Sequence, residues 1–176
     1  MLRFTAALAA CLLVAQSSSA QSYDQLGRAA QAMVAVSEPV VALTNVRVID
    51  GTGAPVREGQ TVVIENGRIT AVGPTASTRV PAGARVMDLA GHTVIPGIVG
   101  MHNHTFYTTS GRSIQANFTA PRLYLASGVT TIRTTGSMSP YSELNLKRQI
   151  DEGQAPGPRM HVTGPYISGD GAGSGM

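Results

Sequence analysis

The apolar run over residues 93–104 constrains the fold of this chain most, because Pro96-Gly97 bends it and two histidines end it. If residues 98–104 form a strand, alternate side chains share a face, and His102 and His104 point the same way. Two neutral imidazoles about 7 Å apart along a strand can converge on one divalent ion. Histidine favours zinc or a neighbouring transition metal.

The spacing of the two histidines has a second interpretation. A His-x-His pair on its own more often decorates a surface strand than binds a metal. Surface strands alternate polar and apolar residues, whereas this run is apolar on both faces, as expected for a parallel strand that is covered on both sides. A buried strand that ends in imidazoles needs partners for them. This context makes metal ligands a stronger interpretation than the spacing alone does, and both interpretations stay open at this point.

The first 20 residues have the organisation of a secretory signal peptide. Arg3 supplies a positive charge, residues 4–15 form an apolar core, and Ser18-Ser19-Ala20 offers small residues for cleavage. The apolar core is too short to span a bilayer. We therefore expect an exported protein, periplasmic or secreted, whose mature chain begins at Gln21 and has no transmembrane span.

Cys11 leaves a second interpretation of the N-terminus open. Residues 8–11 match a bacterial lipoprotein cleavage box, in which this cysteine would be acylated. The apolar run before Cys11 is short and continues after it, which favours soluble export over a lipid anchor. Cleavage after Ala20 would remove the one cysteine of the sequence, and with it any disulfide framework.

Composition excludes some functional classes. The 176 residues carry a formal net charge of +3, and their basic residues are spread along the chain without a basic block. Neither nucleic acid nor an anionic membrane surface is therefore predicted as a partner. The length allows one domain or a domain and a half. Twenty glycines and ten prolines beside only 13% charged residues predict many turns and a buried core.

The first half of the chain is predicted to be mostly β-structure after a short helix. Residues 22–37 have an approximate helical spacing, so residues 21–39 form an N-terminal helix and linker. Residues 40–95 contain short β-branched runs, and Asn66-Gly67 between two of them is a strong hairpin signal. A turn at residues 90–92 separates two further runs. Because no helix intervenes, these strands must pair with one another.

The second half alternates strands with helices. A helix follows Thr119 and ends near Gly128, a strand covers residues 129–133, a second helix covers residues 141–151, and a strand covers residues 160–164. Crossovers of this length join parallel strands.

Several segments together resemble the metal-dependent amidohydrolase superfamily. Residues 94–104 resemble its first barrel strand. Residues 128–133 and 157–160 resemble the second and third strand openings, particularly in the imidazolonepropionase-like and prolidase-like branch. Residues 40–95 resemble the small β-sandwich that precedes the barrel. The resemblance implies an α/β fold in which this β-sandwich segment leads into the first three β/α units of a TIM-like barrel, over residues 96–176.

The resemblance also implies a function. It predicts a metal-dependent hydrolase of carbon–nitrogen bonds in amides or peptide-like substrates, with His102 and His104 as ligands of a divalent metal, zinc above all. The family's bridging lysine, two further histidines and aspartate have no counterpart here, so the catalytic residues stay unknown. The one lysine, Lys147, lies in a predicted helix. Thr134 stands where that branch usually has an aspartate.

An alternative function stays open at this point. The resemblance covers about the first third of a family member, so the chain could be a truncated, non-catalytic product or a subunit that a second polypeptide completes. Three parallel strands would expose an apolar edge, which favours homo-oligomers or a complementing chain. If completed, the site would take a small amide or dipeptide. His92, in a turn, and His161, early in its strand, are not expected to be ligands.

Overall fold

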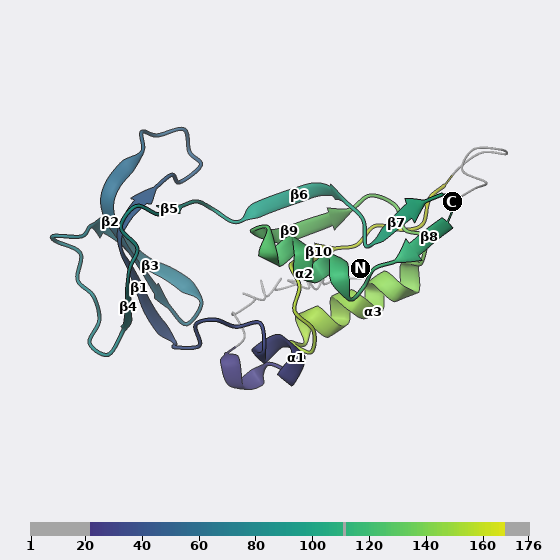
Figure 1. Cartoon of the computed structure of the whole chain (residues 1–176), viewed down its shortest axis with the longest axis horizontal. Helices are drawn as coiled ribbons and strands as arrows, with labels where there is room; N and C mark the ends of the chain where they lie inside the picture. The colour runs from purple at the N-terminus through teal and green to yellow at the C-terminus, as the bar shows by residue number, and fades with distance from the viewer. Residues whose placement is uncertain (1–21, 111, 168–176) are drawn as a thin grey trace, which may run out of the picture.

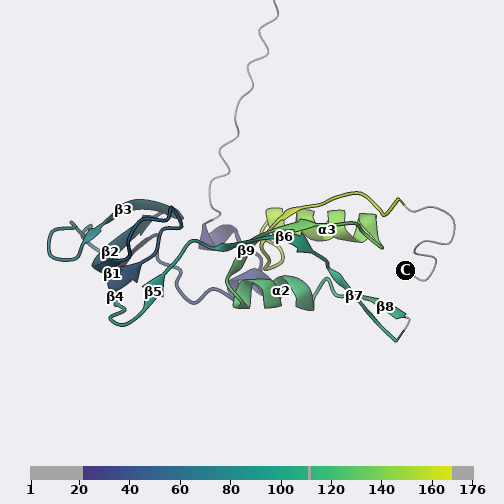
Figure 2. The same ribbon diagram turned by 90° about the horizontal axis from the view of Figure 1, so that it is seen from above.

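The computed structural model describes residues 22–110 and 112–167, which form a mixed α/β structure with three sheets (Figure 1). A five-stranded sheet lies at one end, and the units that alternate strand and helix lie at the other (Figure 2). The predicted signal peptide and Cys11 fall outside the described residues. Within the described ranges, no helix is long and apolar enough to cross a membrane.

The N-terminal segment forms two short helical turns and not one helix over residues 22–37. These are the 3-10 helix η1 (Tyr23–Gln25) and the α-helix α1 (Arg28–Gln31). Between them the Gly27 amide donates to the Gly153 carbonyl over 2.8 Å. This contact ties the segment to the C-terminal end of helix α3 (Pro140–Asp151), so tertiary packing and not helix propensity places it.

The five-stranded sheet is built around its longest central strand. Its strands are β1 (Val40–Val48), β2 (Arg57–Glu65), β3 (Arg68–Pro74), β4 (Arg85–Asp88) and β5 (Thr93–Val94). Strands β1, β2 and β3 pair antiparallel. The predicted hairpin is confirmed, because Asn66 and Gly67 both take positive φ angles, 50° and 74°, between paired Glu65 and Arg68. Val46, Val48 and Val62 form the core of this sheet.

The predicted turn at residues 90–92 is confirmed between β4 and β5, and both strands belong to the five-stranded sheet, but they do not pair with each other. Strands β4 and β5 both pair in parallel with β1, β4 along residues 41–44 and β5 along residues 47–48. The nine-residue β1 is long enough to take the two short strands one after the other on the same edge. The turn therefore separates two short strands that pair one after the other with the same edge of β1.

The second sheet is parallel, as the alternation of strands and helices predicted. It contains β6 (Ile98–Asn103), β9 (Val129–Thr134) and β10 (Arg159–His161) in the order β10-β9-β6. Helix α2 (Thr119–Ala126) leads from β6 towards β9, and α3 connects β9 to β10. Leu146 of α3 packs with Ile132 and Met160 on one face of the sheet. This face is the core of the second part.

A small hairpin between β6 and α2 was not predicted. Strands β7 (Phe106–Thr109) and β8 (Arg112–Gln115) pair antiparallel and form the third sheet. Thr108, Thr109 and Ser113 of this hairpin are exposed, and such polar residues resemble a loop in the sequence.

The prediction that the run ending in the histidine pair is covered on both faces is wrong for the described chain. Ile98, Val99 and Met101 of β6 are 47%, 56% and 61% exposed. The reason is that β6 is the edge strand, while the helix contacts of the sheet fall on β9 and β10. We expected three parallel strands to expose an apolar edge, and β6 is such an edge.

Candidate metal centre

The two histidines lie together at the C-terminal end of β6. His102 is in the strand and His104 follows its last residue, Asn103. Their rings meet edge to face, with centroids 5.3 Å apart and an interplanar angle of 82°. Side chains two apart on an extended strand share a face, so the geometry agrees with the expected orientation of the pair.

The arrangement of the pair fits one divalent metal. A tetrahedral zinc about 2.0–2.1 Å from a nitrogen of each imidazole would set the ring centroids roughly 5 Å apart. The Nδ1 atom of His104 is buried and has no hydrogen-bond partner among the described residues. Within residues 22–110 and 112–167, no cluster of three or more His, Cys, Asp or Glu side chains could hold a metal. This part of the chain therefore supplies two ligands at most.

Aromatic rings continue the line of the imidazoles. The Phe106 ring lies 4.9 Å from the His104 ring, and Tyr166, after β10, lies 6.5 Å beyond Phe106, centroid to centroid. Behind them the Tyr124 hydroxyl of α2 donates to the His104 carbonyl over 2.7 Å. A hydrogen bond with Tyr124 raises the pKa of the Tyr107 phenol above its ordinary value. These contacts fix the backbone that carries the second histidine.

A buried polar network supports the opposite side of this backbone. The Thr105 hydroxyl donates to Glu143 Oε1 over 2.8 Å, and the Gln115 side-chain amide donates to the Thr105 carbonyl over 3.1 Å. Thr105 and Glu143 are fully buried. Glu143 could not be singled out from the sequence, because an acid in the first turn of a helix is ordinarily a solvated residue that interacts favourably with the helix dipole.

Unpartnered buried polar atoms are concentrated around the ends of β6 and β9. The described atoms of this kind near these ends are Asn103 Oδ1, His104 Nδ1, Thr135 Oγ1 and Glu143 Oε2. Buried polar side chains in native proteins are nearly always satisfied by protein, water or a ligand. Water or a ligand would satisfy these atoms.

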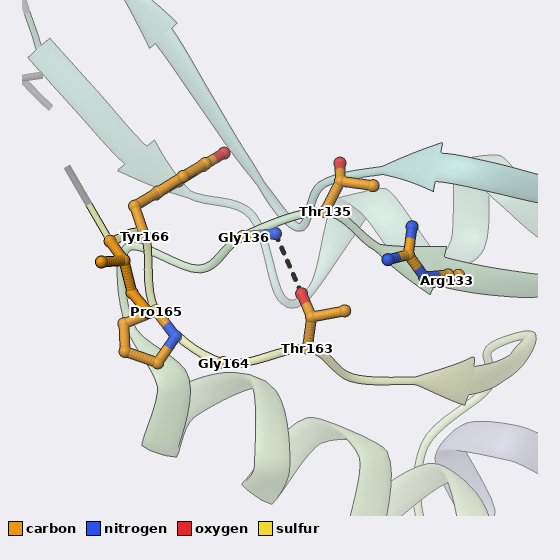
Figure 3. Close-up of a pocket in the computed structure, with 8 residues that line it drawn as sticks. Arg133, Thr135, Gly136, Thr163, Gly164, Pro165 and Tyr166 are labelled. Atoms are coloured by element: carbon orange, nitrogen blue, oxygen red, sulfur yellow. Dashed lines mark hydrogen bonds between the residues drawn. The ribbon is translucent and has the colours of Figure 1, made fainter.

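An open pocket of about 410 Å³ lies at the C-terminal ends of β9 and β10 (Figure 3). The residues that line it are Arg133, Thr135, Gly136, Thr163, Gly164, Pro165, Tyr166 and Ile167. Active sites of parallel α/β barrels form at this end of the strands. The sequence did not single out these residues, because only the register of β9 and β10 brings them together.

Thr134, the last residue of β9, is buried and is hydrogen-bonded to Thr163, which lines this pocket. Its hydroxyl accepts from the Thr163 amide over 2.9 Å. The Thr163 hydroxyl in turn donates to the Thr134 carbonyl over 3.1 Å and accepts from the Gly136 amide over 2.9 Å (Figure 3). Two threonines therefore tie the ends of β9 and β10 without a charge.

The remaining candidate residues lie elsewhere. His92 is exposed in its turn beside β5, as expected. The expectation that His161 lies early in its strand is wrong, because β10 ends at this residue, and its side chain is exposed. Two residues after the end of β10, the Thr163 amide donates to the Thr134 hydroxyl. Lys147 lies on α3, paired with Asp151 one turn later.

Comparison with known proteins finds relatives of part of the chain. No protein-family model matches it. It is 37% identical over 98 residues to an allantoinase of Streptomyces avermitilis and 34% identical over 74 residues to an N-substituted formamide deformylase of Arthrobacter pascens. The structure superposes on that of a candidate prolidase from Bifidobacterium longum with a TM-score of 0.62 and 33% sequence identity.

These similarities cover a small share of the related proteins. The match to the allantoinase spans 55% of this chain and 21% of that protein, and the match to the deformylase spans 41% and 13%. The superposition on the candidate prolidase covers 76% of this chain and 32% of that one. The chain therefore spans about a third of the relatives' length or less.

Proposed function

The chain is related over part of its length to the amidohydrolase superfamily, and on this premise we propose that it carries the first metal ligands of a hydrolase. The reaction is the cleavage of carbon–nitrogen bonds in small amide or dipeptide substrates. His102 and His104 hold a divalent metal, zinc above all. The names of the relatives, an allantoinase, a formamide deformylase and a candidate prolidase, support this reaction class.

One observation carries the proposal. The imidazole rings of His102 and His104 lie with their centroids 5.3 Å apart at the C-terminal end of a parallel strand. The Nδ1 atom of His104 is buried and has no hydrogen-bond partner among the described residues. Leaving a buried imidazole nitrogen without a partner costs about 1–3 kcal/mol. Coordination of a metal would offset this cost at the end of the strands where such sites form.

The residues of this chain orient the ligands. A bound divalent metal would supply Lewis acidity that activates water and polarises an amide carbonyl. Phe106 packs on the His104 ring at 4.9 Å and limits its rotation. Tyr124 holds the His104 carbonyl, and the Thr105–Glu143 hydrogen bond fixes the next residue to α3. These contacts hold the backbone at His104, and Phe106 limits the movement of its imidazole.

The same proposal divides the chain into four segments. Residues 1–20 are a signal peptide for export, residues 21–39 link it to the body, residues 40–95 contribute to a β-sandwich, and residues 96–176 begin a TIM-like barrel. The single five-stranded sheet and the three parallel strands are consistent with those two parts.

A second candidate function is a non-catalytic subunit that another polypeptide completes. The observation that favours it is the exposed apolar edge of β6, with Val99 and Met101 more than half exposed. An uncovered parallel edge offers backbone groups and apolar side chains to a further strand. A second copy of this chain or a complementing chain would take that place.

Zinc titration of the 176-residue polypeptide tests the proposed metal pair. We expect His102→Ala and His104→Ala each to lower zinc affinity at least about tenfold, while the matched control His92→Ala leaves it unchanged, because two imidazoles chelate and one does not. Equal zinc binding by wild type and both variants would end the proposal. The same material with added zinc should hydrolyse no amide or dipeptide above background, because proton-handling groups worth about 10²–10⁴-fold have no counterpart in it.

A further inference from the structure

The positive charge of the chain is concentrated in one stretch. Residues 22–88 carry six acidic and six basic side chains, and residues 143–167 carry three of each. Residues 89–142 between them carry three arginines, Arg112, Arg122 and Arg133, and no aspartate or glutamate. With histidine neutral, the net charge of the described chain therefore comes from this stretch alone, and its surface attracts anionic groups.

The hairpin of β7 and β8 lies in this stretch and has two different faces. Its register is regular, with Tyr107 opposite Ile114 and Thr109 opposite Arg112. Opposite residues, and residues two apart on one strand, share a face of a sheet. All four side chains are exposed, Tyr107 by 54% and Ile114 by 57%, whereas Phe106 on the other face is buried. The outer face of the hairpin therefore carries an apolar pair beside a cation.

Strand β8 is an open edge of this sheet. In the described part of the chain the sheet contains only β7 and β8, so one side of β8 has no strand beside it. The hairpin lies at the end of the molecule opposite the five-stranded sheet (Figure 1), and it extends beyond the end of α2 (Figure 2). Arg112 of β8 has no ion pair within residues 22–110 and 112–167. A third strand that brings a carboxylate would satisfy both the edge and the charge.

We propose that β8 is a docking edge for an extended segment of a partner protein, with a carboxylate beside Arg112 and an apolar side chain beside Ile114. Extended peptides add to open sheet edges through main-chain hydrogen bonds, and their alternate side chains give specificity. Arg112 and Ile114 are two residues apart on one face. The docked segment therefore carries its acidic and its apolar residue two positions apart.

The charge and shape of the hairpin favour this partner over two other occupants. A second copy paired through the same edge would bring two arginines into one short strand pair, and neither β7 nor β8 has an acidic side chain to balance them. A bilayer fits less well, because Thr109 and Arg112 lie next to the turn and the apolar pair lies nearer to the base of the hairpin. Insertion would bury this polar end first.

Three peptides test the docking edge. The first is acetyl-Thr-Val-Thr-Glu-Thr-Val-Thr-amide, which places a valine two positions from the glutamate in either strand direction. The second has glutamine for glutamate, and the third has serine for both valines. Each is titrated into the 15N-labelled 176-residue chain, and the amide shifts of Ser113 and Ile114 are followed.

The first peptide should bind most tightly. We expect about two- to fivefold tighter binding than the glutamine peptide at low salt, the range of exposed ion pairs, and loss of this preference at high salt. We expect about fivefold or more over the serine peptide, because serine buries no apolar surface on Ile114.

Variants of the chain assign these preferences to single side chains. Arg112→Gln should abolish the preference for glutamate, and Arg112→Lys should keep part of it. Ile114→Thr should abolish most of the preference for valine. The matched controls are Arg159→Gln on β10 and Ile69→Thr on β3, exposed residues of the same types on other sheets. Neither control should change either preference.

Three results would overturn the docking edge. They are no binding of any peptide by wild type, equal binding of the glutamate and glutamine peptides, and a glutamate preference that survives in Arg112→Gln. Binding to vesicles of phosphatidylcholine and phosphatidylglycerol that needs Arg112 and Ile114, without peptide binding, would overturn it in favour of a membrane surface. If Ile114→Thr does not fold, the three peptides on wild type and Arg112→Lys decide. Arg112→Gln should bind zinc as wild type does, so this test is independent of the histidine pair.

Discussion

The buried hydrogen bond between Thr105 and Glu143 gives the sharpest prediction about stability. Thr105→Val keeps the shape of the side chain but deletes the hydroxyl that donates to Glu143 Oε1 over 2.8 Å. Both residues are 0% exposed, so solvent cannot replace the bond, and Glu143 Oε2 already has no partner. A buried group left unsatisfied costs about 1–3 kcal/mol. We expect the free energy of unfolding to fall by that amount.

A double-mutant cycle shows whether the bond is the cause. Thr105→Val/Glu143→Leu removes the donor and the acceptor of this bond. The Gln115 side-chain amide, which also donates to the Thr105 hydroxyl over 2.9 Å, keeps its bond to the Thr105 carbonyl. We therefore expect the double variant to recover most of the loss, with a coupling energy of about 1 kcal/mol or more. Thr108→Val is the matched control, because its exposed hydroxyl bonds only Ser113 in the described contacts. Its effect should stay within about 0.5 kcal/mol.

Urea denaturation followed by far-UV circular dichroism measures these free energies, since the sequence holds no tryptophan for fluorescence. A Thr105→Val variant as stable as wild type, or single effects that simply add in the double variant, would refute the reasoning. Either result would mean that the Thr105 hydroxyl and the Glu143 carboxyl are not coupled in the folded chain.

Three further predictions concern the same part of the molecule. Gly136→Ala should destabilise the chain by at least about 1 kcal/mol in urea, because its φ is +90° and a Cβ would clash with the Tyr166 ring. Leu146→Ala should lower the free energy of unfolding by about 2–5 kcal/mol, since this side chain fills the core beside Ile132; a smaller loss would mean that α3 packs loosely. Tyr124→Phe should lower the raised pKa of Tyr107 towards its ordinary value in an ultraviolet titration, and an unchanged pKa would exclude the hydrogen bond as its cause.

The local elements of the fold could be predicted from the sequence where one short signal decides them. Asn66-Gly67 needs only its own positive φ angles to form the hairpin. Gly128, with φ at 78°, ends the turn after α2 as predicted. Leu146 and Ile150, four residues apart, pack on the same core as the helical period requires. Such signals act within a few residues and do not depend on the rest of the chain.

Long-range pairing could not be predicted in the same way. The sequence shows that β4 and β5 are strands but not that both pair with β1, because pairing partners are chosen across 40 or more residues. The exposure of β6 also escaped prediction, since an apolar pattern shows what a strand can bury and not what covers it.

The residues of the candidate site also fall into a local group that could be predicted and a long-range group that could not. His102 and His104 were found because two residues on one strand suffice to bring them together. Arg133, Thr135 and Tyr166 come from two strand ends, and Glu143 from a helix, so their juxtaposition depends on tertiary structure. A single sequence holds no signal for such a set.

The central claim is that His102 and His104 bind one metal ion together. X-ray absorption at the zinc K-edge, on the 176-residue chain loaded with one equivalent of zinc, counts the imidazole ligands directly. We predict two histidine nitrogens at about 2.0–2.1 Å in wild type, one in His102→Ala and in His104→Ala, and two in His92→Ala. Zinc without imidazole scattering, or the same histidine count in wild type and in both site variants, would contradict the claim.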